Sequence, residues 1–188
     1  MTLSNAKLYG GIGAILNLVG PLVPNVGFVL SIVGLVLVFL AIKIISDETG
    51  DRDIFNNFLK AFITAIIGVV LFIGILIGSV GIAVLKGSEL LHPAKMMSII
   101  GSILIGFLIF WILFVVSTYF RKKSYELVAQ YTSVDMFKTA GLLYFIGGIL
   151  LIIGIGLIVI LVAAILEIVA FFSLPEEVSK VESTPVSS

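Results

Sequence analysis

Residues 26–46 read VGFVLSIVGLVLVFLAIKIIS, a run of twenty-one residues with a single charge, Lys43, near its end. Apolar runs of about 18 residues or more are typical of helices that cross a membrane. The rest of the 188-residue chain has the same character, because 60% of its residues are hydrophobic and only 12% are charged. In soluble domains about 45–50% of the residues are apolar and roughly 25% are charged. The sequence therefore predicts an integral membrane protein whose solvent is lipid.

The charge balance and the missing residue types exclude several classes of function. Eleven basic and eleven acidic residues give a net charge of zero, whereas nucleic-acid binding depends on a clustered basic face. The chain has no cysteine, which excludes disulfides, iron–sulfur clusters and thiolate zinc sites. The one histidine, His92, has no second ligand at metal-binding spacing, and no protease, phosphate-loop or dinucleotide motif occurs. We predict a non-enzymatic protein that has no cofactor or metal and binds no nucleic acid.

Breaks in the apolar pattern divide the chain into helices. The prolines of GPLVPNVG (20–27) interrupt the first apolar stretch, because proline lacks the N–H donor and clashes with the preceding turn. A long helix is predicted from about Asp53 to Lys86, and a fourth from Pro93 to about Phe120, where TYFRKK has the aromatics and cations of a membrane boundary. Residues 136–174 are too long for one crossing, and the glycines of IIGIGL (152–157) allow two short helices there.

This division leaves four clear spans, or six helices if each end of the chain forms a tight helical hairpin. The excess of Lys and Arg on the cytosolic side distinguishes the two topologies. Six helices place nine cations on one side and two on the other; four spans give seven and four. The nine are Lys7, Lys43, Arg52, Lys60, Arg121, Lys122, Lys123, Lys138 and Lys180, and the two are Lys86 and Lys95.

We therefore predict an all-α, polytopic transmembrane bundle of six helices in the cell membrane. Residues 1–174 form one domain, and the polar tail 175–188 is expected to be disordered. Both termini, the acidic loop at 47–53 and the segment 121–131 are expected in the cytosol. GSELLHPAK (87–95) is expected outside the cell.

Four acidic residues gather between the second and third helices: Asp47, Glu48, Asp51 and Asp53. A calcium loop of EF-hand type needs glycine at its sixth position, but counting from Asp51 places Asn56 there. Acidic residues also favour the positive end of a helix dipole. We predict a polar turn that begins a helix without an essential metal; binding of a divalent ion or of a partner remains the alternative.

Glu167 is the ionisable residue most deeply placed in an apolar stretch, LVAAILEIVAFFSLP. Such a residue is a candidate functional site by default. It lies eight residues before Pro175, so its side chain is expected to reach the interface, to be protonated, or to hydrogen-bond a neighbour. Together with Asn17 in the first helix, it suggests a polar path of the kind a small channel or transporter uses.

Small residues recur at every fourth position in the two central helices: Gly74 and Gly78 in the third, and Ser98, Ser102 and Gly106 in the fourth. Such stripes allow the backbones of two membrane helices to approach closely. We predict an antiparallel pair with Gly78 near Ser102 and Gly74 near Gly106, and with Gly68 off the contact face. Chance placement is the alternative, because the chain has nineteen glycines.

Two stretches, KIISDETGDRDIFNNFL (43–59) and SYELVAQYTSVDMFKTAGLLYFIGGILLIIGIG (124–156), resemble an archaeal membrane family catalogued as domain of unknown function nine hundred and ninety-six. The resemblance covers nearly the whole chain up to Pro175. It implies an archaeal multi-pass membrane protein and supplies no activity, ligand or catalytic residue. We therefore expect a scaffold or small subunit of a membrane complex, with membrane-protein partners or a homo-oligomer, and a channel or transporter as the alternative.

Overall fold

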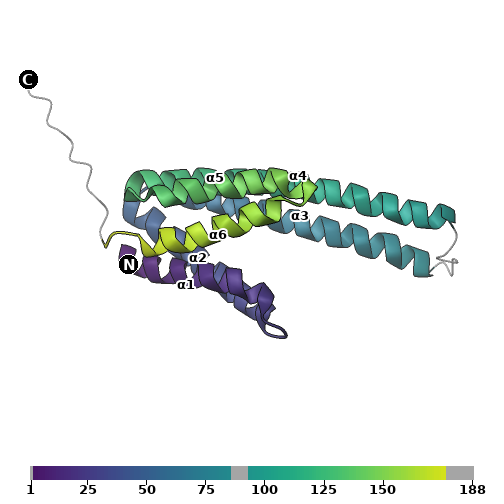
Figure 1. Cartoon of the computed structure of the whole chain (residues 1–188), viewed down its shortest axis with the longest axis horizontal. Helices are drawn as coiled ribbons and strands as arrows, with labels where there is room; N and C mark the ends of the chain where they lie inside the picture. Colours follow the sequence, from purple (N-terminus) through teal and green to yellow (C-terminus); the bar gives the residue numbers. More distant parts are fainter. Residues whose placement is uncertain (1, 86–92, 177–188) are drawn as a thin grey trace, which may run out of the picture.

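The structure is a computed structural model that describes residues 2–85 and 93–176 (Figure 1). In those ranges the elements follow the order α1 (Leu3–Val19), η1 (Gly20–Leu22), α2 (Gly27–Thr49), α3 (Arg52–Leu85), α4 (Pro93–Thr132), α5 (Asp135–Leu150), η2 (Leu151–Ile153) and α6 (Gly156–Phe172). Four segments are long and apolar enough to cross a membrane: Gly27–Thr49, Arg52–Gly81, Met96–Thr132 and Asp135–Ile153. The predicted all-α transmembrane fold of six helices is confirmed.

Both ends of the chain form helical hairpins, at the two breaks that the sequence predicts. Pro21 lies in the 3-10 turn η1 between α1 and α2. Gly154 ends η2 with φ 82°, a left-handed conformation that glycine adopts without strain, and α6 begins two residues later. The hairpin α1–α2 contacts the hairpin α5–α6 through α1 and α6.

The central pair α3–α4 is about twice as long as the hairpins. With 34 and 40 residues, α3 and α4 extend about 51 and 60 Å, whereas α1 and α6, with 17 residues each, extend about 26 Å. The two long helices lie side by side and continue alone beyond the hairpins (Figure 1). We call this projecting part, residues 69–85 and 93–110, the arm. It begins past Trp111, whose indole N–H donates to the carbonyl of Gly148 at 3.0 Å.

The prediction that the fourth helix ends near Phe120 is wrong. Helix α4 continues through Arg121, Lys122 and Lys123 to Thr132, because no proline or glycine interrupts this part of the chain. The three cations therefore do not form a loop at the membrane boundary. Lys122 pairs with Glu126 one turn later at 2.8 Å, while Arg121 enters the bundle.

The hairpin α1–α2 is held by close backbone contact at glycines. A Cβ added to Gly13 would lie 2.6 Å from the carbonyl oxygen of Gly34, and one added to Gly27 would lie 2.0 Å from that of Gly20. Neither position has room for a side chain. The small residues of this hairpin recur every seventh position: Ala6, Gly13 and Gly20 on α1, and Gly27, Gly34 and Ala41 on α2.

The hairpin α5–α6 uses the same arrangement. A Cβ on Gly156 would lie 2.2 Å from the carbonyl oxygen of Gly147. Seven residues further from the turn on each helix, Ala140 and Ala163 are fully buried. Backbone contact at small residues therefore closes both terminal hairpins, as is typical of helix pairs in lipid.

The predicted glycine pairing in the arm does not hold at Gly74 and Gly78. A Cβ added at either glycine would meet no described atom within 4 Å. Gly106 does face α3, because a Cβ added there would lie 3.0 Å from Ile75. Gly68, expected off the contact face, also faces the other helix, because a Cβ added there would lie 3.2 Å from Leu113.

Large side chains fill the space between α3 and α4, such as Phe72 and Phe110 with their rings 5.7 Å apart. Gly74 and Gly78 are therefore not required there, whereas Gly106 lies close to Ile75. Ser102 donates its hydroxyl to the carbonyl of Ser98 in its own helix at 3.0 Å.

We expect Gly13→Ala to destabilise the protein by about 1–3 kcal/mol, the usual cost of overpacking a tight contact. The matched control is Gly74→Ala, which meets open space and should be neutral or stabilising by up to about 1 kcal/mol, because alanine is the better helix former. The free energy of unfolding in detergent micelles measures both changes. Equal destabilisation by the two variants would contradict this account of the packing.

Candidate functional site

Glu167 lies in the interior of the bundle, where only 3% of its surface is exposed. Helix α6 directs it towards α4 and α5. Of the three fates that the sequence allows, the structure shows the third, because the side chain hydrogen-bonds its neighbours. It neither reaches the surface nor stands alone.

Each oxygen of the Glu167 carboxylate accepts two hydrogen bonds. Oε1 accepts from Nη2 of Arg121 at 2.7 Å and from the Tyr125 hydroxyl at 2.5 Å. Oε2 accepts from the same Nη2 at 3.0 Å and from the Tyr144 hydroxyl at 2.5 Å. Arg121 and Tyr125 lie on one face of α4, four residues apart, and Tyr144 belongs to α5. One carboxylate thus connects three helices.

The guanidinium of Arg121 is stabilised by aromatic rings as well. It lies 4.1 Å from the ring centroid of Tyr144 and 5.4 Å from that of Tyr125, within the range of cation–π attraction. Its three hydrogen bonds to described residues all leave from Nη2, the third reaching the Tyr125 oxygen at 3.3 Å. Its Nε is buried and has no partner within the described part of the chain. An unpaired buried donor costs about 1–3 kcal/mol.

The charges of Arg121 and Glu167 cancel, which is a condition for placing either of them in an apolar interior. Removing an isolated ion from water costs several kcal/mol, and only a well-bonded counter-ion compensates that cost. The pair satisfies this condition, with the carboxylate accepting four hydrogen bonds in all. We call these four residues, Arg121, Tyr125, Tyr144 and Glu167, the core ion-pair cluster.

Aromatic side chains connect the core ion-pair cluster to the other helices. The ring of Tyr125 stacks on Phe58 of α3 with centroids 6.2 Å apart, and its edge meets Phe137 of α5 at 5.5 Å. Phe137 in turn contacts Phe171 of α6, and Phe171 lies against Gly10 of α1, where no Cβ would fit. The cluster is therefore continuous with the packing of α1, α3, α5 and α6.

A cavity of about 600 Å³ adjoins the core ion-pair cluster. All six helices contribute to its walls, which are mostly apolar. Its polar lining residues are Asn17, Ser117, Arg121 and Tyr144. Ser117 is already engaged, because its hydroxyl donates to the carbonyl of Ala61 at 2.8 Å. The structure thus places Asn17 and two partners of Glu167 on one cavity.

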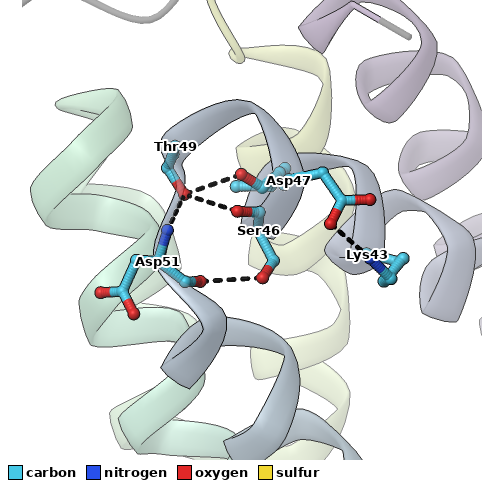
Figure 2. A network of polar contacts seen from close by, with 6 residues as sticks. Lys43, Ser46, Asp47, Thr49 and Asp51 are labelled. Atoms are coloured by element: carbon cyan, nitrogen blue, oxygen red, sulfur yellow. Dashed lines mark hydrogen bonds and ion pairs between the residues drawn. The ribbon is translucent and has the colours of Figure 1, made fainter.

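The acidic segment forms a tight turn with a hydrogen-bonded backbone (Figure 2). Helix α2 ends at Thr49, and Gly50 turns the chain with φ 75°. The carboxylate of Asp51 caps α3 by accepting from the N–H of Asp53 at 2.8 Å. The Ser46 hydroxyl donates to the carbonyl of Asp51 at 2.8 Å. This turn begins a helix, as the sequence predicts.

The four carboxylates of this segment do not converge on one point. Asp47 and Glu48 belong to the last turn of α2, the end of a helix dipole that does not favour acids, and Asp47 pairs with Lys43. The carboxylates of Asp47 and Asp51 point to opposite sides of the turn (Figure 2). Within residues 2–85 and 93–176, no three His, Cys, Asp or Glu residues gather as a metal site would require.

Sequence reasoning identified Glu167 and Asn17 but missed Arg121. The triplet Arg121-Lys122-Lys123 looked like a boundary signal, and nothing local relates Arg121 to a carboxylate forty-six residues later. A signal did exist: a carboxylate in lipid needs a cation, and the chain has only two arginines, Arg52 and Arg121. Tyr125, one helical turn after Arg121, completes the pattern.

The sequence of the chain matches a protein family. Residues 30–165 match the family model described as Protein of unknown function (DUF996). The chain belongs to this family. The uncharacterised protein MJ1644 of Methanocaldococcus jannaschii is 46% identical over 178 residues, which cover 94% of this chain and 96% of that protein. No solved structure matches the chain significantly.

These matches confirm the resemblance to an archaeal membrane family. The part of the chain that matches the DUF996 model contains Arg121, Tyr125 and Tyr144, and it ends two residues before Glu167. The match with the archaeal protein spans nearly all of both chains. Neither match brings an activity or a ligand with it.

In this DUF996 protein, we expect removal of either Arg121 or Glu167 to destabilise the fold strongly. Arg121→Met or Glu167→Leu alone should cost about 3–5 kcal/mol, because each leaves a buried charge unpaired. The double variant should be more stable than either single variant. The free energy of unfolding in detergent micelles gives the coupling energy.

The control for that measurement is the exposed pair Lys43–Asp47, whose side chains are 46% and 61% exposed. Lys43→Met should cost no more than about 1 kcal/mol. If the double variant at the core lost as much free energy of unfolding as the two single variants together, the two charges would not be coupled.

Proposed function

We propose that this membrane protein is a non-enzymatic scaffold, or a small subunit, of a complex in the cell membrane. The observation that carries the proposal is the saturation of Glu167. Both carboxylate oxygens are held by three side chains from two other helices. A group bonded in this way is suited to holding helices together, whereas a proton relay or an ion site needs a group that can exchange partners.

The arm is the part of the scaffold suited to contact another membrane protein. Its helices touch little besides each other, and their outward side chains are large and apolar: Ile77 is 68% exposed, Met97 74% and Leu104 63%. In a membrane such surfaces face lipid or a neighbouring protein. The proposed partner is a second membrane protein packed along the arm.

The apolar arm also constrains how the protein lies in the membrane. Phe39 of α2 contacts Phe58 of α3, and the α1–α2 turn begins twelve residues, or about 18 Å, from Phe39. Along the axis of the bundle, that turn therefore lies about level with Val70 of α3. Helix α3 continues about 22 Å beyond Val70, to Leu85. If lipid covers the exposed arm, the turn lies inside the bilayer.

We infer that the terminal hairpins are re-entrant, entering and leaving the membrane on one side. The α1–α2 turn suits this position, because Pro21 and Pro24 carry no N–H, and the N–H groups of Val23 and Gly27 are hydrogen-bonded within the turn at 3.0 Å. The start of α1 and the end of α6 lie at the same end of the bundle as the α2–α3 and α4–α5 turns (Figure 1). The cation count supports a cytosolic position for that end.

This topology predicts the labelling of single cysteines by a membrane-impermeant maleimide. Asn56→Cys should react from the cytosolic side, and Met97→Cys, near the arm tip, from outside. Pro24→Cys should react from neither side, because it lies in lipid. Reaction of Pro24→Cys from outside intact cells would show that the hairpin crosses the membrane completely. The predicted outer loop, residues 87–95, lies mostly outside the described residues.

The partner proposal is tested by affinity purification from native membranes with two matched variants. Ile77 on the arm and Ile158 on α6 are both 68% exposed. Ile77→Trp should reduce the amount of the co-purifying membrane protein several-fold, whereas Ile158→Trp should leave it unchanged. Equal retention with both variants would remove the arm from the interface.

A channel or transporter is the second candidate, favoured by the cavity that Asn17 and Arg121 share. It predicts ion flux or solute uptake in reconstituted vesicles that Glu167→Gln abolishes and Lys43→Met preserves. The scaffold proposal predicts no flux above that of protein-free vesicles. Flux with this pattern would replace the scaffold with the transporter.

A further inference from the structure

The cavity beside the core ion-pair cluster is suited to a ligand that arrives through the lipid. Its volume of about 600 Å³ lies within the usual range for small-molecule sites. Its apolar walls include Ala14 and Leu18 of α1 and Leu161 and Ala164 of α6. Pro21 and Leu157, at the turns of the two hairpins, complete the wall farthest from the cluster. With the hairpins re-entrant, as proposed above, this end of the cavity lies at the level of the acyl chains.

The polar end of the cavity offers hydrogen-bond donors. Arg121 lines the cavity, and 27% of its side-chain surface is exposed. Nη2 is turned to Glu167, so the other edge of the guanidinium, which carries Nε and Nη1, makes none of the three hydrogen bonds of Arg121. Nε has no partner among the described residues. Because Nε is enclosed by protein, Nη1 is the donor on this edge that a molecule in the cavity can reach.

Charge balance restricts the acceptor to an uncharged group. Glu167 already neutralises Arg121, and no other charged residue among those the structure describes lines the cavity. An anion would add an uncompensated charge to an apolar site, at a high desolvation cost. A hydroxyl or carbonyl oxygen would accept from the free guanidinium edge without that cost.

We propose that this cavity binds an uncharged, lipid-soluble molecule with a long apolar body and a single hydroxyl or carbonyl oxygen at its head. The head oxygen accepts a hydrogen bond from the free edge of Arg121. The side chain of Asn17 also lines the cavity, one helical turn from Pro21. The apolar body lies between α1 and α6 and leaves the cavity past Pro21 and Leu157. This role goes beyond a scaffold, and only the route by which the ligand enters rests on the membrane placement proposed above.

The test is photolabelling of the full chain in lipid nanodiscs with a diazirine-bearing hexadecanol, followed by mapping of the labelled residues. The label should fall on the cavity walls in α1 and α6 and should saturate. Unlabelled hexadecanol should compete roughly tenfold better than hexadecane, because only the alcohol bonds to a charged donor. Palmitate, which is charged at neutral pH, should compete poorly.

Variants separate binding from folding. Ala164→Phe on α6 and Ala65→Phe on α3 fill the cavity from two different helices, and each should abolish the saturable label. Ile105→Phe, on the exposed surface of the arm, should preserve it. Each variant is included only if its unfolding transition matches that of the parent protein; loss of label in one well-folded filling variant suffices.

Three results would overturn the proposal. Equal competition by hexadecane would show that no head group is recognised, stronger competition by palmitate would show an anion site, and labelling confined to the arm would show no cavity ligand. Failure of the cysteine-labelling test would change the membrane placement but not these outcomes. The two proposals can therefore fail separately.

Discussion

The structure depends on the neutralisation of one buried carboxylate in a lipid-facing protein. Glu167 is 3% exposed, and a charge at that position requires a counter-ion with hydrogen bonds. Arg121 supplies the charge, and Tyr125 and Tyr144 supply two more donors. Because these groups belong to α4, α5 and α6, the requirement fixes the C-terminal hairpin against the long helix α4. It also explains why α4 continues through a triplet of cations that would otherwise belong at the membrane surface.

The second constraint is the close contact of backbones within each hairpin. Gly13 with Gly34, and Gly147 with Gly156, bring helices together at distances that leave no room for a Cβ. The hairpins can therefore be short and still pack firmly. Within its described residues the arm has no such backbone contact and uses bulky side chains instead, so the protein consists of two tightly closed hairpins against a long, loosely covered helix pair.

Local signals in the sequence predicted much of this fold. Proline lacks the N–H donor that a helix needs, and clustered glycines weaken a helix, so Pro21 and the glycines around Gly154 located both hairpin turns from the sequence. The capping role of Asp51 could be predicted in the same way, because it depends on the next two residues. These features depend on neighbours in the chain.

Features that depend on distant residues were harder to predict. Glu167 was recognised as a candidate site, but its pairing with Arg121 is a tertiary contact without a local signal. The four-residue spacing of Gly74 and Gly78 was misleading, because nineteen glycines produce such spacings by chance. The informative spacing was seven, from Gly13 to Gly20 and from Gly27 to Gly34, and it becomes meaningful only when the two helices are known to form one hairpin.

The most direct test of this account is the ionisation state of Glu167 in the membrane. Infrared spectroscopy of the protein in lipid at neutral pH, with Glu167→Gln as the reference, distinguishes a carboxylate from a protonated carboxylic acid. The account predicts that Glu167 contributes carboxylate bands to the difference spectrum and no band of a protonated acid, as expected for a residue paired with Arg121. A carbonyl band of a protonated acid that disappears in Glu167→Gln would show that the interior is not held by an ion pair, and would contradict the account.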